Sequence, residues 1–405
     1  MQKNYLLTII LILCCFSSQA QWTQKLFNNA NVTVLKRVNN VCFAYGIDNS
    51  FQGKLYRSDN NGGVWTAIDS VTFKFIYIND ITYDSLHNKY VICTYAGNGI
   101  FTSVDGNTWA STGANWSGDA ITYIGGRLVL SLATSPDLGI AVSTDAGNSF
   151  SPSNSGLVYP FYAHHVTRID NSLYIYLQAF APCYISTDVG TNWFPRSNGL
   201  SYAPNCFYKF ANKVFTGTEG GHVYVYNINF IDNQSWNRTD KGLPKTSNIN
   251  ALTSKRDTLF CGGDTIGVWM RVDNLWTNFS SGLPQKITVN KLLIAGRYLF
   301  AATKNGLWKI KLSSETFDEP ETTNIALEKN SVNDIKIFPT ITPGKLTIQS
   351  PSIPASIMLT NANGQLLKQW SNTSEINISD VYPGNYFITI NINGKLFMQQ
   401  VIKTN

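Results

Sequence analysis

The sequence predicts an all-β protein: a seven-bladed β-propeller followed by a small β-sandwich domain. Three observations indicate this fold class. A turn motif returns roughly every 42 residues, which is the period of an array of similar units. Each unit holds about four short strand-like runs, the content of one propeller blade. The first and last marks of the series, Trp22 and Phe317, fall in the same phase of the repeat.

The aromatic residue that closes each turn motif measures the period. Six such residues are separated by 44, 41, 43, 43 and 40 positions: Trp65, Trp109, Phe150, Trp193, Trp236 and Trp276. Ahead of each one, runs such as residues 90–93 and 173–176 are rich in β-branched and aromatic side chains. Short runs of this kind, bounded by Gly and Asn, are typical of strands.

The turn itself resembles the Asp-box family, also called BNR repeats, whose pattern is Ser-x-Asp-x-Gly-x-Thr-Trp. The match is close in residues 143–150 and 186–193, fair at Ser58 and Ser103, and eroded before Trp236 and Trp276. We expect a structural role, because Ser and Asp side chains in tight turns bond their own backbone and Gly supplies a positive φ. A sugar-binding role is the alternative, but the recurrence of the motif in successive blades favours a structural role in each turn. The expected structural residues are Ser58, Trp65, Ser103, Asp105, Trp109, Ser143, Asp145, Gly147, Phe150, Ser186, Asp188, Gly190 and Trp193.

The number of blades follows from the two ends of the series. A step of 41 residues from Trp276 reaches Phe317, and a step of 43 back from Trp65 reaches Trp22. Residues 22–28 are therefore expected to form the outer strand of the last blade, beside residues 299–312, which closes the ring and removes an exposed edge. We place the propeller at residues 21–317. Seven blades argue against a sialidase, because sialidases with this motif resemble six-bladed rings.

The first 20 residues have the pattern of a signal peptide. Lys3 precedes an apolar run over residues 6–16, and Ser18 and Ala20 resemble a cleavage site. The mature chain is expected to begin at Gln21 or Trp22. A membrane anchor is the alternative, but the run is too short for the roughly 30 Å of hydrocarbon in a bilayer. Lipid attachment at a cysteine is also disfavoured, because the residue before Cys14 is Leu and not a small one.

Cysteines and charge exclude several classes of function. Five of the seven cysteines follow the expected signal peptide, an odd number with no CxxC pair, so neither a zinc site nor a disulfide framework is indicated. Cys93 and Cys261 lie in apolar runs and are expected to be buried, whereas pairing of Cys183 with Cys206 stays open. The net charge of +6 is spread without basic runs, which argues against nucleic acid. No phosphate loop, nucleophile elbow or HExxH occurs, so we expect no cofactor and no metal.

The end of the chain changes character. Residues 318–333 are polar and are expected to be a linker. Residues 334–405 return to six or seven short strand-like runs, with hairpin signals at Asn363-Gly364 and Asn393-Gly394. We expect a small β-sandwich here.

This segment resembles the C-terminal sorting domain of the type IX secretion system of Bacteroidetes. The match runs through Phe338-Pro339, residues 346–348, 361–365 and 378–386, and Lys403. The family's usual Asn-Pro is here Thr340-Ile341, a small departure. The resemblance implies that the secretion machinery is a partner and that the chain crosses the outer membrane, after which the domain is cleaved or anchored. A carbohydrate-binding or adhesion sandwich is the alternative.

Any functional site is expected on the propeller face opposite the turn motif, where the loops between blades lie. We call it the loop face. Aromatic rings and polar groups suit a glycan or protein ligand, and the candidates are Tyr77, Trp116, Tyr162, His164, Tyr202 and His222. His164 and His165 are adjacent on a strand and should point to opposite faces, so they are not expected to share a metal.

The sequence favours a secreted, non-catalytic binding or scaffold module. Single seven-bladed propellers with this motif also resemble the photosystem II assembly factor family, which supports binding as a common use of such propellers, although nothing in this sequence points to a photosynthetic partner. The alternative is a glycoside hydrolase, which needs two acids. Asp80 and Asp119 open the innermost strands of adjacent blades, and Glu219 is a third candidate. Against this, the similar seven-bladed hydrolases resemble two-propeller xyloglucan-cleaving enzymes, and this chain has one propeller.

Overall fold

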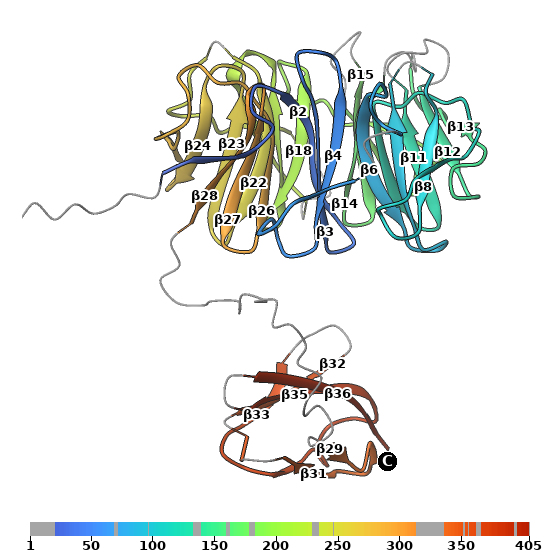
Figure 1. Cartoon of the computed structure of the whole chain (residues 1–405), viewed down its shortest axis with the longest axis vertical. Coiled ribbons are helices and arrows are strands. Elements are labelled where there is room, and N and C mark those ends of the chain that lie inside the picture. Colours follow the sequence, from blue (N-terminus) through green and yellow to red (C-terminus); the bar gives the residue numbers. More distant parts are fainter. Residues whose placement is uncertain are drawn as a thin grey trace, which may run out of the picture. The chain divides into compact units, whose positions relative to one another are not determined.

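The computed structural model describes residues 21–312 and 336–404, apart from 69–71, 96, 133–138, 159–162, 178–182, 229–234, 246, 351–352, 355, 362–365 and 393–394. The expected signal peptide and linker, Tyr162, Phe317 and the tips of the two predicted hairpins lie outside these residues. The chain divides into two compact units, Met1–Glu321 and Thr322–Asn405, which are described separately (Figure 1).

The described part of the first unit contains seven four-stranded antiparallel sheets. Their first strands are β2 (Asn31–Val38), β6 (Ile78–Asp84), β10 (Ala120–Ile124), β14 (Ala163–Ile169), β18 (Pro204–Phe210), β22 (Ile249–Lys255) and β26 (Val289–Ala295). The second strands are β3 (Val41–Ile47), β7 (Lys89–Thr94), β11 (Arg127–Ser131), β15 (Ser172–Leu177), β19 (Lys213–Thr218), β23 (Thr258–Gly263) and β27 (Tyr298–Thr303). The third strands are β4 (Gly53–Ser58), β8 (Ile100–Ser103), β12 (Ile140–Ser143), β16 (Cys183–Ser186), β20 (Val223–Asn227), β24 (Gly267–Val272) and β28 (Gly306–Lys311). The fourth strands are β5 (Thr66–Ala67), β9 (Ala110–Ser111), β13 (Ser151–Pro152), β17 (Phe194–Pro195), β21 (Asn237–Arg238), β25 (Leu275–Asn278) and, out of order, β1 (Thr23–Leu26).

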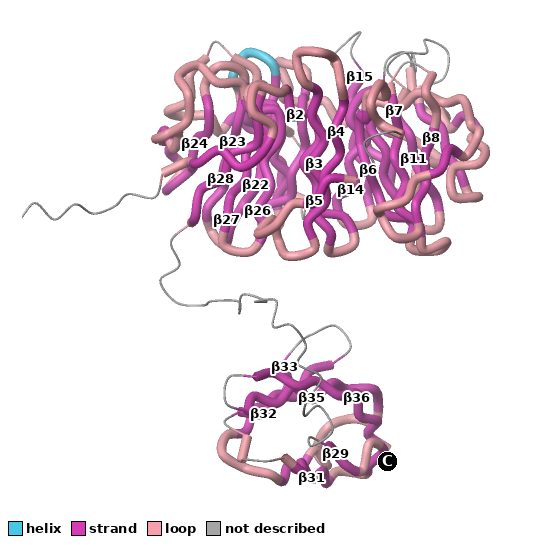
Figure 2. Tube along the Cα trace, in the orientation of Figure 1, coloured by secondary structure: helices cyan, strands magenta, loops and turns pink. Residues whose placement is uncertain are grey.

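The first strands contact one another in a closed ring that runs from β2 through β6, β10, β14, β18, β22 and β26 back to β2. They are therefore the innermost strands, and the seven sheets stand around them as the blades of a propeller (Figure 1). This is the predicted fold class. Loops cap both ends of the sheets, and the one short 3-10 helix among the described residues, η1 (Glu219–Gly221), lies at one of these ends (Figure 2).

The N-terminal strand completes the last sheet. β1 pairs antiparallel with β28, with Thr23 opposite Lys309, and the sheet order is β1-β28-β27-β26. Trp22 is buried just before this strand, and its Nε1 donates to the carbonyl oxygen of Phe279 at 2.8 Å. The chain therefore closes the ring with its own first strand, at the place that the phase of Trp22 predicts.

Four turns between third and fourth strands share one hydrogen-bond pattern. In the turn after β12, the Ser143 hydroxyl donates to Asp145 and accepts the backbone NH of Gly147. The same pair of bonds recurs at Ser58, Ser103 and Ser186, with Asn60 in the place of Asp in the first turn. The backbone NH groups of Thr108 and Asn107 lower the pKa of Asp105 to about 2. These side chains thus bond within their own turns.

The aromatic residue after each turn lies between neighbouring sheets. The indole Nε1 of each of three tryptophans donates to a backbone carbonyl of the preceding sheet's last segment: Trp193 to Ser153, Trp236 to Arg196 and Trp276 to Thr239. Trp22 makes the matching bond to Phe279. This bond therefore recurs at four of the seven aromatic positions, two of which follow eroded turns. Among the described residues, the buried Nε1 atoms of Trp65 and Trp109 have no hydrogen-bond partner.

All five described cysteines are free thiols, and Cys42, Cys93, Cys183 and Cys261 are buried in the sheets. The open alternative of a Cys183–Cys206 disulfide is not realised. Cys183 lies in the third strand of its sheet, whereas Cys206 lies in the innermost strand of the next sheet. Burial raises the pKa of Cys206 to about 11.

The second unit has two sheets, in the orders β29-β31-β34 and β30-β36-β35-β32-β33. Its strands are β29 (Lys336–Phe338), β30 (Ile341–Thr342), β31 (Lys345–Gln349), β32 (Ser356–Asn361), β33 (Leu366–Trp370), β34 (Glu375–Asn377), β35 (Gly384–Ile392) and β36 (Lys395–Lys403). Its core contains Ile348, Ile357, Ile376, Ile388 and Val401. The predicted sandwich is confirmed. It has eight described strands where six or seven were predicted, because the short strands β30 and β34 have no clear pattern in the sequence. The two expected hairpin partners, β32 with β33 and β35 with β36, are paired antiparallel.

Candidate functional site: the central channel

A cavity of about 440 Å³ lies where the innermost strands meet, and all seven of them contribute to its wall. Its titratable and charged residues are Lys36, Asp80, Asp119, His165, Arg168, Cys206 and Lys291. The two aspartates that the sequence singled out therefore lie in one cavity, from adjacent sheets. Glu219, the third acid candidate, is exposed in η1 and does not line this cavity.

Bulges in the innermost strands position this wall. The pairing register shifts near the start of β2, β6, β18, β22 and β26, and further along in β14. A bulge turns an extra side chain out of the regular alternation. At three bulges this residue is an asparagine whose side-chain amide donates to a backbone carbonyl of the neighbouring sheet. Asn250 donates to Val289 and Asn290 to Val32, both in innermost strands, and Asn79 donates to Gly118, two residues before β10.

These asparagine bonds between sheets were not predicted from the sequence. The only signal was an asparagine near the start of several innermost strands. Because innermost strands of different blades are not paired in one sheet, such side-chain bonds supply hydrogen bonds between them.

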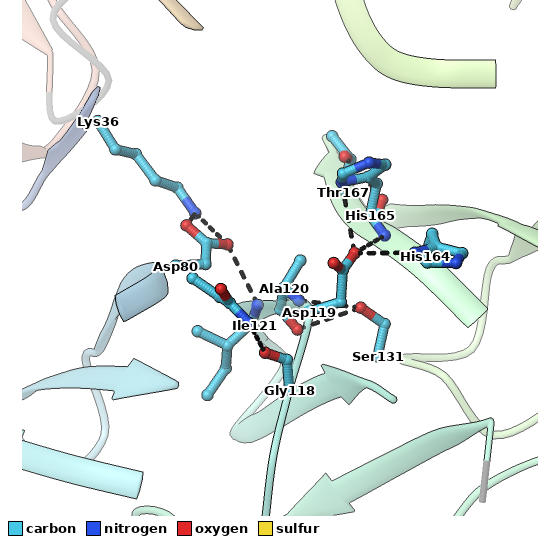
Figure 3. A network of polar contacts seen from close by, with 11 residues as sticks. Lys36, Asp80, Gly118, Asp119, Ala120, Ile121, Ser131, His164, His165 and Thr167 are labelled. Atoms are coloured by element: carbon cyan, nitrogen blue, oxygen red, sulfur yellow. Dashed lines mark hydrogen bonds and ion pairs between the residues drawn. The ribbon is translucent and has the colours of Figure 1, made fainter. Parts of the chain in front are cut away.

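The Asp80 carboxylate is fully engaged (Figure 3). The ammonium group of Lys36 lies 2.8 Å from Oδ1 and 3.0 Å from Oδ2. The backbone NH of Ile81 donates to Oδ1 at 2.8 Å, and that of Ile121 donates to Oδ2 at 3.1 Å. Asp80 thus ties three adjacent sheets together. Lys36 and the two backbone NH groups together hold the carboxylate in an ion pair between sheets.

The Asp119 carboxylate faces two histidines. His164 Nδ1 and His165 Nδ1 lie 3.4 and 3.5 Å from the same oxygen, Oδ2, and the backbone NH of His165 donates to it at 3.0 Å (Figure 3). Burial opposes ionisation of Asp119, but the two imidazoles and this NH outweigh it and hold the carboxyl pKa below its usual range. Burial lowers the pKa of His165 to about 4, so this ring is neutral at pH 7.

The expectation that His164 and His165 point to opposite faces is wrong. Strict alternation holds for a regular strand, but β14 is bulged between His164 and Thr167, and His165 has a left-handed φ of 53°. This conformation brings both rings to Asp119, while His164 also stacks on Tyr176 with ring centroids 5.1 Å apart. Even so, no group of three or more His, Cys, Asp or Glu among the described residues is arranged to hold a metal ion.

The remaining candidate residues do not line the channel. Trp116 packs on Phe150, with centroids 5.7 Å apart. Tyr202 packs on His222 at 4.4 Å, and the buried His222 contacts the carboxylate of Asp240 at 2.6 Å. Tyr77 is half-buried, and its carbonyl accepts the NH of Tyr95. The structure therefore gathers Asp80, Asp119 and the His164–His165 pair, and it leaves the other candidates dispersed.

The neutral His165 predicts a pH dependence of stability. Its pKa in the folded chain, about 4, lies below the roughly 6.5 of an unfolded chain, so the unfolded state binds more protons between these values. Stability is therefore expected to fall as the pH drops from 6.5 to 4, by about 1–2 kcal/mol after allowance for exposure to water. Urea unfolding against pH would measure this, and His165→Gln should flatten the curve in that window. A curve that His165→Gln leaves unchanged, or that the control His87→Gln flattens equally, would contradict the assignment.

The second unit matches a known family of domains. Residues 336–404 match the family described as secretion system C-terminal sorting domain. This supports export by the type IX secretion system to the cell surface or beyond. No curated protein matches the chain. Among the described residues there is no helix with the length and apolarity needed to cross a membrane.

Several solved structures are similar to this chain. YCF48 from Cyanidioschyzon merolae is 10% identical, with a TM-score of 0.56 over 72% of this chain and 99% of that one. YCF48 has also been solved bound to D1 peptide, with a TM-score of 0.55, 12% identity and coverage of 73% and 95%. Virginiamycin B lyase from Staphylococcus aureus has a TM-score of 0.58 at 12% identity, over 73% and 99%. The extracellular domain of a hybrid two-component system of B. thetaiotaomicron has a TM-score of 0.55 at 14% identity. The match covers 96% of this chain and 59% of that domain's chain. At these identities the likeness shows the fold alone.

Proposed function

We propose that this chain is a secreted or surface-held propeller that binds a glycan or protein ligand on its loop face without converting it. Two lines of support come from different units. The sorting-domain match supports export, and the propellers that resemble this one include an extracellular domain and a peptide-bound protein.

The state of Asp80 carries the non-catalytic part of the proposal. A general acid or nucleophile needs a carboxyl group that can reach the substrate and exchange a proton with it. Asp80 instead accepts bonds from Lys36 and two backbone NH groups. Asp119 is likewise held by its histidine neighbours. Both carboxylates thus have structural partners.

A glycoside hydrolase is the second candidate. The observation that favours it is that Asp80 and Asp119 come from adjacent sheets into one cavity. It would require Asp80 to leave Lys36, and it predicts release of sugar from a bound glycan.

A binding screen tests the proposal. The full chain would be applied to arrays of glycans and of peptides, and each hit would be titrated by calorimetry. We expect saturable binding with one ligand per chain. Failure of every glycan and every peptide to bind would contradict a role as a binding module.

A further inference from the structure

Three aromatic side chains on the loop face are largely exposed: Phe51 by 69%, Phe75 by 68% and Tyr95 by 48%. Phe51 lies between β3 and β4, Phe75 between β5 and β6, and Tyr95 directly after β7. In antiparallel blades, the connection from second to third strand and the link to the next blade lie at the same end. The three rings therefore stand at one end of two adjacent sheets. We call them the aromatic platform.

The loops that carry the platform are bonded to each other. The Gly53 NH donates to the carbonyl of Lys74 at 2.9 Å, and the Tyr95 NH donates to that of Tyr77 at 2.9 Å. The hydroxyl group of Tyr45, a buried residue of β3, donates to the carbonyl of Ile76 at 2.7 Å and so attaches this loop to the sheet. Two residues before Phe75, Phe73 is buried against Phe101 and Trp109. The rings are thus presented by a fixed backbone, which lowers the entropy lost when a ligand binds.

The backbone of Phe51 is strained. Its φ is 58°, a left-handed conformation that is an outlier for a bulky side chain. Asp48 imposes it, because its carboxylate accepts the NH groups of Ser50 and Gln52 while its carbonyl accepts the NH of Phe51. Glycine would adopt this conformation without strain. Packing does not explain a phenylalanine at this position, because its side chain is 69% exposed.

We propose that the aromatic platform binds a neutral glycan chain by stacking sugar rings on Phe51, Phe75 and Tyr95. This rests on the proposed binding function and names the ligand class and the residues. A pyranose ring has flat C–H faces that pack on aromatic rings, and hydroxyl groups at its edge that need hydrogen bonds. Side-chain amides that can supply such bonds lie nearby in the sequence: Gln52 follows Phe51 in the loop between β3 and β4, and Asn98 follows Tyr95 in the loop between β7 and β8.

The surroundings favour a glycan over a lipid surface or an acidic partner. Asp48 is engaged by its own turn, and Lys74 lies 5.4 Å from the ring centre of Phe75. On the described part of these loops, the exposed large apolar side chains are aromatic. The exposed aliphatic residues Val64, Leu86 and Val104 instead lie in turns at the opposite end of the same sheets. A membrane-binding face combines apolar side chains, phenylalanine included, with many Lys and Arg residues. In the described parts of these loops, residues 48–52, 72–77, 95 and 97–99, Lys74 is the one basic residue.

The test uses the full chain and affinity gel electrophoresis in starch, laminarin, xylan and galactomannan. We expect at least one polysaccharide to retard the chain, and Phe51→Gly and Phe75→Ala each to weaken this binding about tenfold. Phe51→Gly relieves the backbone strain, so it should not lower the melting temperature, and its binding loss cannot come from unfolding. Val104→Ser, at an equally exposed site on the opposite face, should bind as the unaltered chain does.

The outcomes separate this inference from the proposed function. Polysaccharide binding that both platform variants retain would overturn the platform and leave the binding module standing. Binding of an array peptide or of anionic vesicles that is lost in both variants would overturn the ligand class. If no polysaccharide retards the chain while a peptide binds elsewhere, the inference fails and the proposed function stands. If nothing binds, both fail.

Discussion

Replacing Trp22 by alanine should lower the free energy of unfolding of the propeller by about 3–5 kcal/mol, the usual cost of removing a large buried aromatic side chain. The side chain of Trp22 is 2% exposed and belongs to the same hydrophobic cluster as Phe260. Its ring packs edge-on against Phe279, and its Nε1 donates to the Phe279 carbonyl. It also anchors β1, the strand that completes the last sheet. Loosening β1 would leave β28 with an unpaired edge in an otherwise closed ring. Urea unfolding followed by tryptophan fluorescence and by circular dichroism would measure the loss.

Thr23→Ala is the matched control, since Thr23 directly follows Trp22, is exposed and is the first residue of β1. Its effect should stay within about 0.5 kcal/mol. Equal effects of the two substitutions, or a Trp22→Ala chain as stable as the original, would show that the N-terminal strand does not hold the ring closed.

Removal of the Asp80 carboxylate should cost about 2–4 kcal/mol. Asp80→Ala takes the acceptor from Lys36 and from the backbone NH groups of Ile81 and Ile121. A buried ion pair that loses one partner leaves an uncompensated charge, which is costly. The lower end of the range allows for Lys36, whose side chain is 39% exposed, against 16% for Asp80. Thermal and urea unfolding would measure the change.

The Lys209–Asp170 pair provides a close control. Lys209 is exposed to the same extent as Lys36, 39%, but Asp170 is 56% exposed. Asp170→Ala should therefore cost no more than about 1 kcal/mol. A similar small cost for Asp80→Ala would mean that Asp80 is free to act on a ligand, which would revive the hydrolase alternative.

The fold could be predicted because its signals are local and repeated. Trp193, Trp236 and Trp276 each take one position between sheets, so their spacing counts blades directly. Trp22 falls in the same phase, and this was sufficient to predict that the two ends of the propeller share a sheet. The aromatic position survives where the serine turn is lost, because Trp236 and Trp276 still fill the hydrophobic clusters between neighbouring sheets.

The arrangement of the channel could not be predicted in the same way. Alternation along a strand puts His164 and His165 on opposite faces, and only the bulge in β14 brings both to Asp119. The partner of Asp80 is Lys36, 44 residues earlier, and no local pattern connects them. Phe51 was missed because its exposure and its positive φ depend on the turn that Asp48 holds.

The central claim, that the propeller binds its ligand without converting it, is tested most directly by recovering that ligand. Chain and ligand would be incubated at saturating concentration for a day, and the ligand would then be analysed by mass spectrometry and by an assay for reducing sugar ends. We predict that the ligand is recovered intact and that Asp80→Asn and Asp119→Asn give the same product profile as the unaltered chain. Cleavage by the unaltered chain that either substitution abolishes would contradict this account and identify the channel as an active site.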